Sequence, residues 1–187
     1  MILTKSDLKR FLKTERDRQN MSYPTIARFT FGEHACVYSH IKKLRVLEYH
    51  KNCRQHCGFF MRFWHSVLYA KSLLSYRKSC LKTNIFILPN TVDEGLLIPH
   101  PGFIRVDTFC SIGKNCTILP MVLFGKKKPH TEANIVVGDN CYIGTGATIL
   151  GPVKIGNNVT IGAGAVVVKD VSDGSVVVGV PAKEIKR

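Results

Sequence analysis

His100 and His130 are the residues of this chain best placed to do chemistry, because each lies where a long regular repeat is interrupted. Imidazole readily accepts and returns a proton near neutral pH, since its ordinary pKa is about 6.5. His100 lies in the segment PHPGFIR, and His130 in the segment GKKKPHTEANIV. Breaks in a regular structure often carry function. The sequence therefore indicates His100 as a candidate general base. For His130 the sequence leaves two interpretations open, a contact to a ligand or a solvated loop tip.

The repeat that positions these histidines has a period of six residues. Its recurring positions are Val106, Ile112, Ile118, Phe124, Val137, Ile143, Ile149, Ile155, Ile161 and Val167. An α-helix would repeat near 3.6 residues and a half-buried strand near 2. A six-residue period that continues over many units fits one flat side of a three-sided coil. It predicts a parallel β-helix with the recurring side chain inside. Glycine follows many of these positions, and we expect it to supply the backbone angles of the bends.

The chain divides into a helical part, a β-helix and a tail. We expect a helical, basic N-terminal domain at 1–83, the β-helix at 84–172 with a protruding loop at 125–136, and a closing loop and tail at 173–187. Apolar spacing predicts helices at 3–19, 39–52 and 59–80.

The formal net charge of +14 is concentrated in the N-terminal half, where residues 1–91 hold 17 Lys and Arg against 5 Asp and Glu. No nucleic-acid-binding module accompanies this charge, so we expect no nucleic-acid partner. The basic, aromatic helix at 59–80 is compatible with a peripheral contact to an anionic membrane surface, but we favour a helix packed on its neighbours. The N-terminus does not read as a signal peptide, and no stretch is long enough to span a membrane, which favours a cytoplasmic protein.

A metal site is not expected. One cluster in the helical half has residue types that bind metals, at His50, Cys53, His56 and Cys57. Structural zinc sites often draw ligands from two separated segments, and no second pair stands out. The two histidines of the β-helix are also too few for a γ-type carbonic anhydrase, which needs three.

The run IGTGATILGPVKIGNNVTIGAGAVVVKDV, closed by VVGVPAK, resembles the hexapeptide-repeat acyltransferases. It is most similar to the serine acetyltransferases and the O-acetyltransferases of capsular polysaccharide synthesis, over about residues 84–185. The segment GLLIPHPGFIRV resembles their catalytic-histidine segment, with His100 in the histidine's place. The resemblance implies a left-handed parallel β-helix with an α-helical N-terminal domain. It also implies a homotrimer that binds acetyl-CoA between neighbouring β-helices.

The same resemblance assigns roles to residues of this chain. Thr145, Gly146, Ala163 and Gly164 match the surface that meets the pantetheine arm, and Lys169 and Lys183 match positions near the nucleotide end of CoA. In the long loop, His130 and Asn134 are candidate contacts to substrate or CoA. His100 would accept the proton of the acceptor hydroxyl, and backbone N–H groups would stabilise the oxyanion.

The chain departs from serine acetyltransferases where they recognise serine. Pro99 replaces an Asp directly before the catalytic His, Ile85 replaces the orienting Asp, and Ala133 and Asn134 replace an Arg-His pair. We therefore favour acetyl transfer to a hydroxyl of a sugar or glycan precursor, with His100 oriented by Asn84 or by a backbone carbonyl. The alternatives are a serine O-acetyltransferase and a non-catalytic trimeric scaffold.

Overall fold

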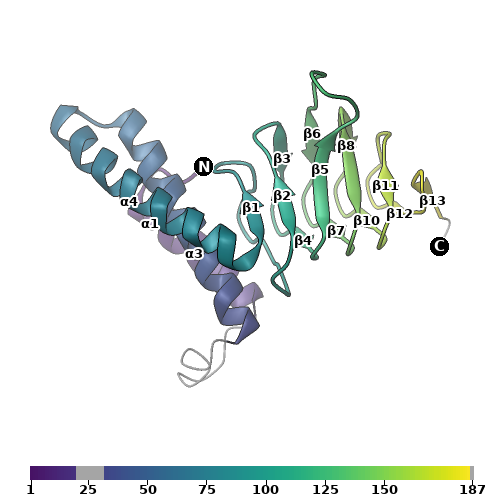
Figure 1. The fold of residues 1–187 in the computed structure, drawn as a ribbon, viewed down its shortest axis with the longest axis horizontal. Coiled ribbons are helices and arrows are strands. Elements are labelled where there is room, and N and C mark those ends of the chain that lie inside the picture. Colours follow the sequence, from purple (N-terminus) through teal and green to yellow (C-terminus); the bar gives the residue numbers. More distant parts are fainter. Residues whose placement is uncertain (20–31, 186–187) are drawn as a thin grey trace.

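The computed structural model describes residues 1–19 and 32–185 and joins a helical domain to one end of a parallel β-helix (Figure 1). The helices are α1 (Lys5–Arg18), α3 (Glu33–His56) and α4 (Phe59–Thr83). The strands are β1 (Ile85–Ile87), β2 (Ile104–Val106), β3 (Cys110–Ile112), β4 (Thr117–Ile118), β5 (Val122–Lys126), β6 (Ile135–Val137), β7 (Tyr142–Ile143), β8 (Thr148–Gly151), β9 (Val153–Ile155), β10 (Thr160–Ile161), β11 (Val166–Val167), β12 (Val176–Val178) and β13 (Lys183–Glu184).

The strands form the three faces of a prism. The first sheet has the order β1-β2-β5-β8-β11, the second β3-β6-β9, and the third β13-β12-β10-β7-β4. Neighbouring strands are parallel except the last pair, β12 and β13. This arrangement confirms the expected left-handed parallel β-helix with a helical N-terminal domain.

The six-residue period lines the inside of the prism as predicted. All ten recurring side chains from Val106 to Val167 are at most 3% exposed, and the small side chains between them are buried too. Burial raises the pKa of Cys110 to about 11, which suits a thiol that acts as a small core residue. The role expected for the glycines differs, however. A Cβ on Gly113 would lie 2.7 Å from the carbonyl carbon of Gly138, so glycine is needed there for close approach of the coils.

Three boundaries differ from the sequence-based expectation. Helix α3 is longer than 39–52, and only Cys57 and Gly58 separate it from α4. The loop expected at 125–136 is shorter, because β5 runs to Lys126 and β6 begins at Ile135. The tail is partly ordered as strand, since β12 continues the third sheet beside β10 and β13 folds back on it. The coil series therefore extends beyond residue 172.

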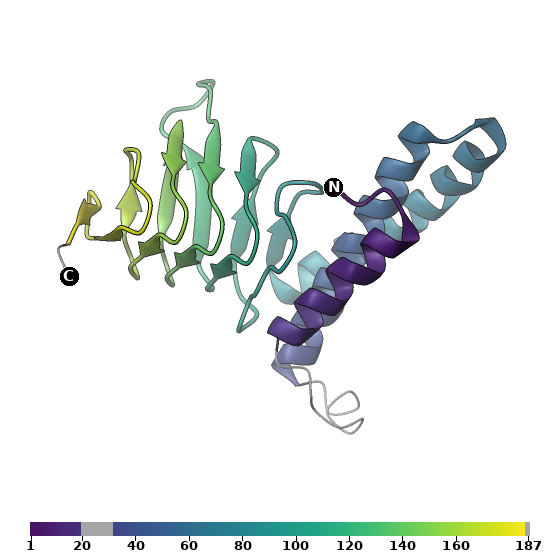
Figure 2. The same cartoon turned by 180° about the vertical axis from the view of Figure 1, so that it is seen from behind.

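The helical domain is attached to the first coil through the buried side chain of Arg45. Its guanidinium donates to Glu15 at 2.8 and 2.5 Å, to Glu48 at 2.9 Å, and to the carbonyls of Val92 and Asp93 at 2.8 Å each. This links α1, α3 and the β-helix, and Figure 2 shows α1 lying against the domain beside the first coil. Burial raises the pKa of Glu15 to about 7, because the attraction of Arg45, which also serves Glu48, does not offset the loss of water.

Candidate active site

The turns that join the third sheet to the first stack into one edge of the prism, which we call the His100 ridge. Its turns are residues 119–121, 144–147 and 162–165; the turn 99–103 precedes them in the first coil, and the hairpin turn 179–182, between β12 and β13, follows them beside the start of β11. Backbone bonds connect them: Gly146 N–H donates to Pro120 O at 3.1 Å and Gly164 N–H to Thr145 O at 2.8 Å. Because neighbouring strands are spaced about 4.8 Å apart, the His100 turn is roughly 10 Å from the Thr145 turn and roughly 14 Å from the next.

His100 is held at this ridge by a carboxylate from the helical domain. Its Nδ1 lies 3.0 Å from Oε2 of Glu33, the first residue of α3. When the imidazole is neutral, a carboxylate at this nitrogen favours the tautomer with the hydrogen on Nδ1, which leaves the lone pair of Nε2 for an incoming hydroxyl. The side chains are 59% and 63% exposed, so the pair contributes little to stability. Its effect is to favour one orientation of the ring.

Asn84 does not have the orienting role expected from the sequence. It ends α4 in the left-handed conformation, with φ 59°, and its backbone carbonyl accepts a bond from Ile104 N–H at 3.2 Å. The His100 ring is hydrogen-bonded to Glu33 instead, and it also lies beside the His34 ring, with 6.2 Å between the ring centroids. Sequence reasoning missed Glu33 because 67 residues separate it from His100 and it lies outside the helix expected there.

The turn that carries His100 is also tied to the helical domain. Gly102 N–H donates to the carbonyl of Thr83, in the last turn of α4, at 3.2 Å. Only glycine fits at this point, since Gly102 has φ 153° and a Cβ would lie 2.9 Å from Cβ of Pro120. The end of α4 therefore positions the turn, while the start of α3 provides the partner of the imidazole.

Five of the expected ligand-binding residues share this ridge or border it. Thr145 and Gly146 form one ridge turn, and Ala163 and Gly164 form the next. Gly146 and Gly164 have φ 72° and 68°, which favours glycine, and a Cβ on Gly164 would meet no atom within 4 Å. The surface is therefore low and open at this point. Lys183 lies in β13, directly after the hairpin turn 179–182, and is exposed.

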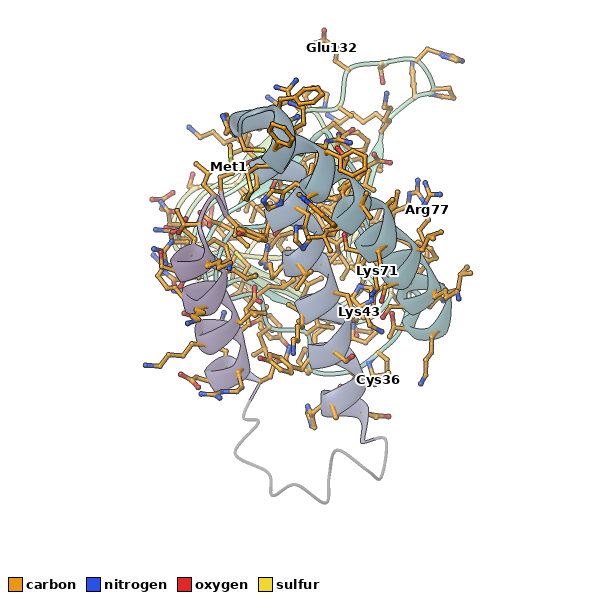
Figure 3. All side chains as sticks on the ribbon, turned by 90° about the vertical axis from the view of Figure 1, so that its left-hand side faces the viewer. Met1, Cys36, Lys43, Lys71, Arg77 and Glu132 are labelled. Atoms are coloured by element: carbon orange, nitrogen blue, oxygen red, sulfur yellow. The ribbon has the colours of Figure 1, made fainter. Side chains whose placement is uncertain are left out.

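The remaining expected residues lie on a different edge. His130 and Asn134 belong to the loop between β5 and β6, which joins the first sheet to the second and projects from the prism (Figure 1). In Figure 3 this loop, marked by Glu132, extends beyond the body of the molecule. Lys169 follows β11 on the same edge. A single chain therefore does not bring His130, Asn134 or Lys169 to His100.

Within residues 1–19 and 32–185, no group of three or more His, Cys, Asp or Glu side chains is arranged to hold a metal ion. His50, from the cluster noted in the sequence, instead contacts His65, with 3.1 Å between the two Nδ1 atoms. None of the described helices is long and apolar enough to cross a membrane.

The bacterial transferase hexapeptide family (six repeats) matches residues 134–169. The serine acetyltransferase of Bacillus pumilus is 34% identical over 125 residues, which cover 66% of this chain and 58% of that protein. Soybean serine acetyltransferase has a similar fold, with a TM-score of 0.73 and 24% identity over 95% of this chain and 69% of that one. A serine acetyltransferase solved as a complex with CoA gives a TM-score of 0.68 and 21% identity, over 96% of this chain and 68% of that one.

The similarity in fold covers 95% of this chain for the soybean structure, and the similarity in sequence covers 66% of it for the Bacillus pumilus protein. The chain spans between half and three fifths of the length of the bacterial relatives that it matches. These similarities confirm the resemblance to hexapeptide-repeat acyltransferases of the serine acetyltransferase kind.

Proposed function

We propose that this chain, which resembles the hexapeptide-repeat acyltransferases of the serine acetyltransferase kind, is an acetyl-CoA-dependent O-acetyltransferase with His100 as general base. The observation that supports this most is the stacking of His100 with the Thr145 and Ala163 turns on one ridge. Nε2 of His100 takes the proton of the acceptor hydroxyl while its oxygen attacks the thioester carbonyl. The tetrahedral intermediate then collapses to the acetyl ester, and the CoA sulfur leaves and receives the proton from His100.

The ridge suits acetyl-CoA in both shape and charge. With the thioester at His100, the thin pantetheine arm would follow the open surface of Thr145, Gly146, Ala163 and Gly164. Lys183 would then lie near the phosphates, where a cation is favourable. Backbone N–H groups at the ridge would stabilise the oxyanion. A serine acetyltransferase of similar fold has been solved as a complex with CoA, which supports CoA as the ligand.

We also propose that the protein is a homotrimer in the cytoplasm. In a trimer of side-by-side β-helices, the edge with His130, Asn134 and Lys169 of one copy would face the His100 ridge of the next. Apolar side chains exposed on the third sheet or at its ridge support such an assembly, namely Met121, Tyr142, Val178 and Val180. The seven cysteines are free thiols, which suits a reducing compartment.

For the acceptor, the relatives favour serine over the sugar hydroxyl that the sequence first suggested. Glu33 also supplies the carboxylate that the chain lacks at Ile85, which weakens one argument against serine. A sugar hydroxyl stays the second candidate, because Pro99 still replaces an Asp and Ala133 is buried where an Arg-His pair is expected.

Thiol release from acetyl-CoA would test this function against a panel of serine, simple sugars and nucleotide sugars. Turnover with serine alone would establish the serine acetyltransferase, and turnover with a sugar alone would establish the second candidate. His100→Ala should lower either activity by about 10²–10⁴-fold, whereas the matched control His56→Ala, at an exposed histidine of α3, should not. Acetyl-CoA binding without transfer to any acceptor, unchanged by His100→Ala, would favour the non-catalytic scaffold.

A further inference from the structure

Helix α4 exposes a continuous apolar stripe along most of its length. Phe60, Val67, Leu74 and Leu81 recur every seven residues and are 83%, 48%, 62% and 78% exposed. Trp64 lies between the first two, on the same face. Residues at this spacing share one side of a helix, so the stripe is about 30 Å long. Helix α4 does pack on α3 as expected, but this apolar face lies outside that contact.

The stripe is wider at the start of the helix. Phe59, Phe63 and Met61 are also exposed, so the tip of the α3–α4 hairpin presents several large apolar side chains. Aromatic rings edged by basic side chains are typical of helices that lie at a membrane–water interface.

The chain segment that carries the stripe has only positive charges. Between Tyr49 and Val92 the chain has seven Lys and Arg and no Asp or Glu: Lys51, Arg54, Arg62, Lys71, Arg77, Lys78 and Lys82. Lys71 and Lys78 continue the face of the stripe, where a lysine can lay its methylenes on apolar surface and keep its ammonium group in water. Figure 3 looks onto the helical domain from the side away from the β-helix, and shows Lys43, Lys71 and Arg77 spread over it.

This charge pattern discriminates between occupants of the stripe. A second copy of α4 packed on the first would bring Lys71 and Lys78 against other cations, with no acidic side chain on the helix to compensate. An anionic lipid surface complements the same pattern, because it takes up the aromatic side chains and attracts the basic ones. We propose that the exposed face of α4 docks the protein peripherally on an anionic membrane surface. This inference does not rest on the proposed acetyl transfer.

The fluorescence of Trp64 tests this directly, because it is the only tryptophan of the chain and lies within the stripe. The full-length protein would be titrated with vesicles of equal parts phosphatidylglycerol and phosphatidylcholine, and with vesicles of phosphatidylcholine alone. We expect a blue shift of the emission and co-sedimentation with the anionic vesicles, both weakened by added salt.

Two sets of variants separate the contributions. Phe60→Ser with Leu74→Ser should abolish binding, and the exposure of both side chains means that the fold should survive, as circular dichroism would verify. Lys71→Glu with Lys78→Glu should weaken partitioning by at least about fivefold for each reversed charge. The matched control Lys127→Glu with Lys128→Glu makes the same change of net charge in the β5–β6 loop and should bind as the wild type does.

Three results would overturn the proposal. The first is Trp64 emission that does not change with anionic vesicles but shifts to the blue with protein concentration, which would mean that a second copy covers α4. The second is emission that responds to neither, which would mean that the face stays in water. Binding lost equally in the control variant would attribute the attraction to net charge alone and would also refute a docking face on α4.

Discussion

Replacing Arg45 by methionine should loosen the helical domain from the β-helix. Methionine has a comparable apolar stem but no donors, so Glu15 would lose both of its recorded bonds, and the carbonyls of Val92 and Asp93 would lose theirs to Arg45. The side chain of Glu15 is 0% exposed and that of Glu48 is 2% exposed, so neither carboxylate can turn to water.

The cost follows from leaving buried charge unpaired. Removing one partner of such a pair typically costs about 3–5 kcal/mol. For a chain of this size, each kcal/mol corresponds to about 2–4 °C in Tm, so we expect a fall of roughly 6–20 °C. The loss should be larger at pH 8 than at pH 5, because Glu15 can take up a proton at the lower pH and no longer needs a cation.

Thermal unfolding followed by circular dichroism at both pH values measures this effect. Arg10→Met, at an exposed arginine of α1 that contacts Glu94, is the matched control and should lower Tm by no more than about 4 °C. Equal losses for Arg45→Met and Arg10→Met would refute the role of the buried cluster. A loss that did not depend on pH would refute the part assigned to Glu15.

Three further changes have predictable outcomes. The pKa of Glu15 is about 7 in the folded protein, above its ordinary value of 4.5. The contribution of Glu15 to the free energy of unfolding is therefore fully present below pH 4.5 and is lost as the pH rises to about 7. Glu15→Gln should remove this pH dependence, as measured by urea unfolding. Burial lowers the pKa of His40 to about 4. The contribution of neutral His40 to the free energy of unfolding is therefore lost as the pH falls from 6.5 towards 4. His40→Gln should reduce this loss of stability at acid pH in the same assay. Gly164→Val and Gly174→Val should each cost about 1–2 kcal/mol, because both positions have positive φ and open space. Only Gly164→Val, on the His100 ridge, should weaken acetyl-CoA binding in calorimetry, and equal binding by the two variants would contradict the proposed path of the cosubstrate.

The β-helix was predictable because its signal is local and periodic. Every six-residue unit repeats the same requirement for one inward apolar side chain, so ten positions from Val106 to Val167 all predict one fold. The edge on which each turn lies was also available from the sequence. Thr145 and Ala163 are 18 residues apart, one full coil of three sides, which places them on one ridge. The loop with His130 follows a different side.

The contacts between the helical domain and the β-helix were not predictable in the same way. Glu33 reaches His100 across 67 residues, and Arg45 reaches Glu15 across 30, and neither pair belongs to a repeat. The exposed face of α4 was not predictable for a related reason, since apolar periodicity identifies a helix face but not what covers it.

The most direct test of the proposed active site is a comparison of binding and transfer in wild type, His100→Ala and Glu33→Gln. Acetyl-CoA affinity would be measured by calorimetry, and acetyl transfer by thiol release with the acceptor identified from the panel. We predict that both variants bind acetyl-CoA as the wild type does. His100→Ala should lower kcat by about 10²–10⁴-fold, and Glu33→Gln should lower kcat less and change its pH profile. Transfer at the wild-type rate by His100→Ala would contradict the account.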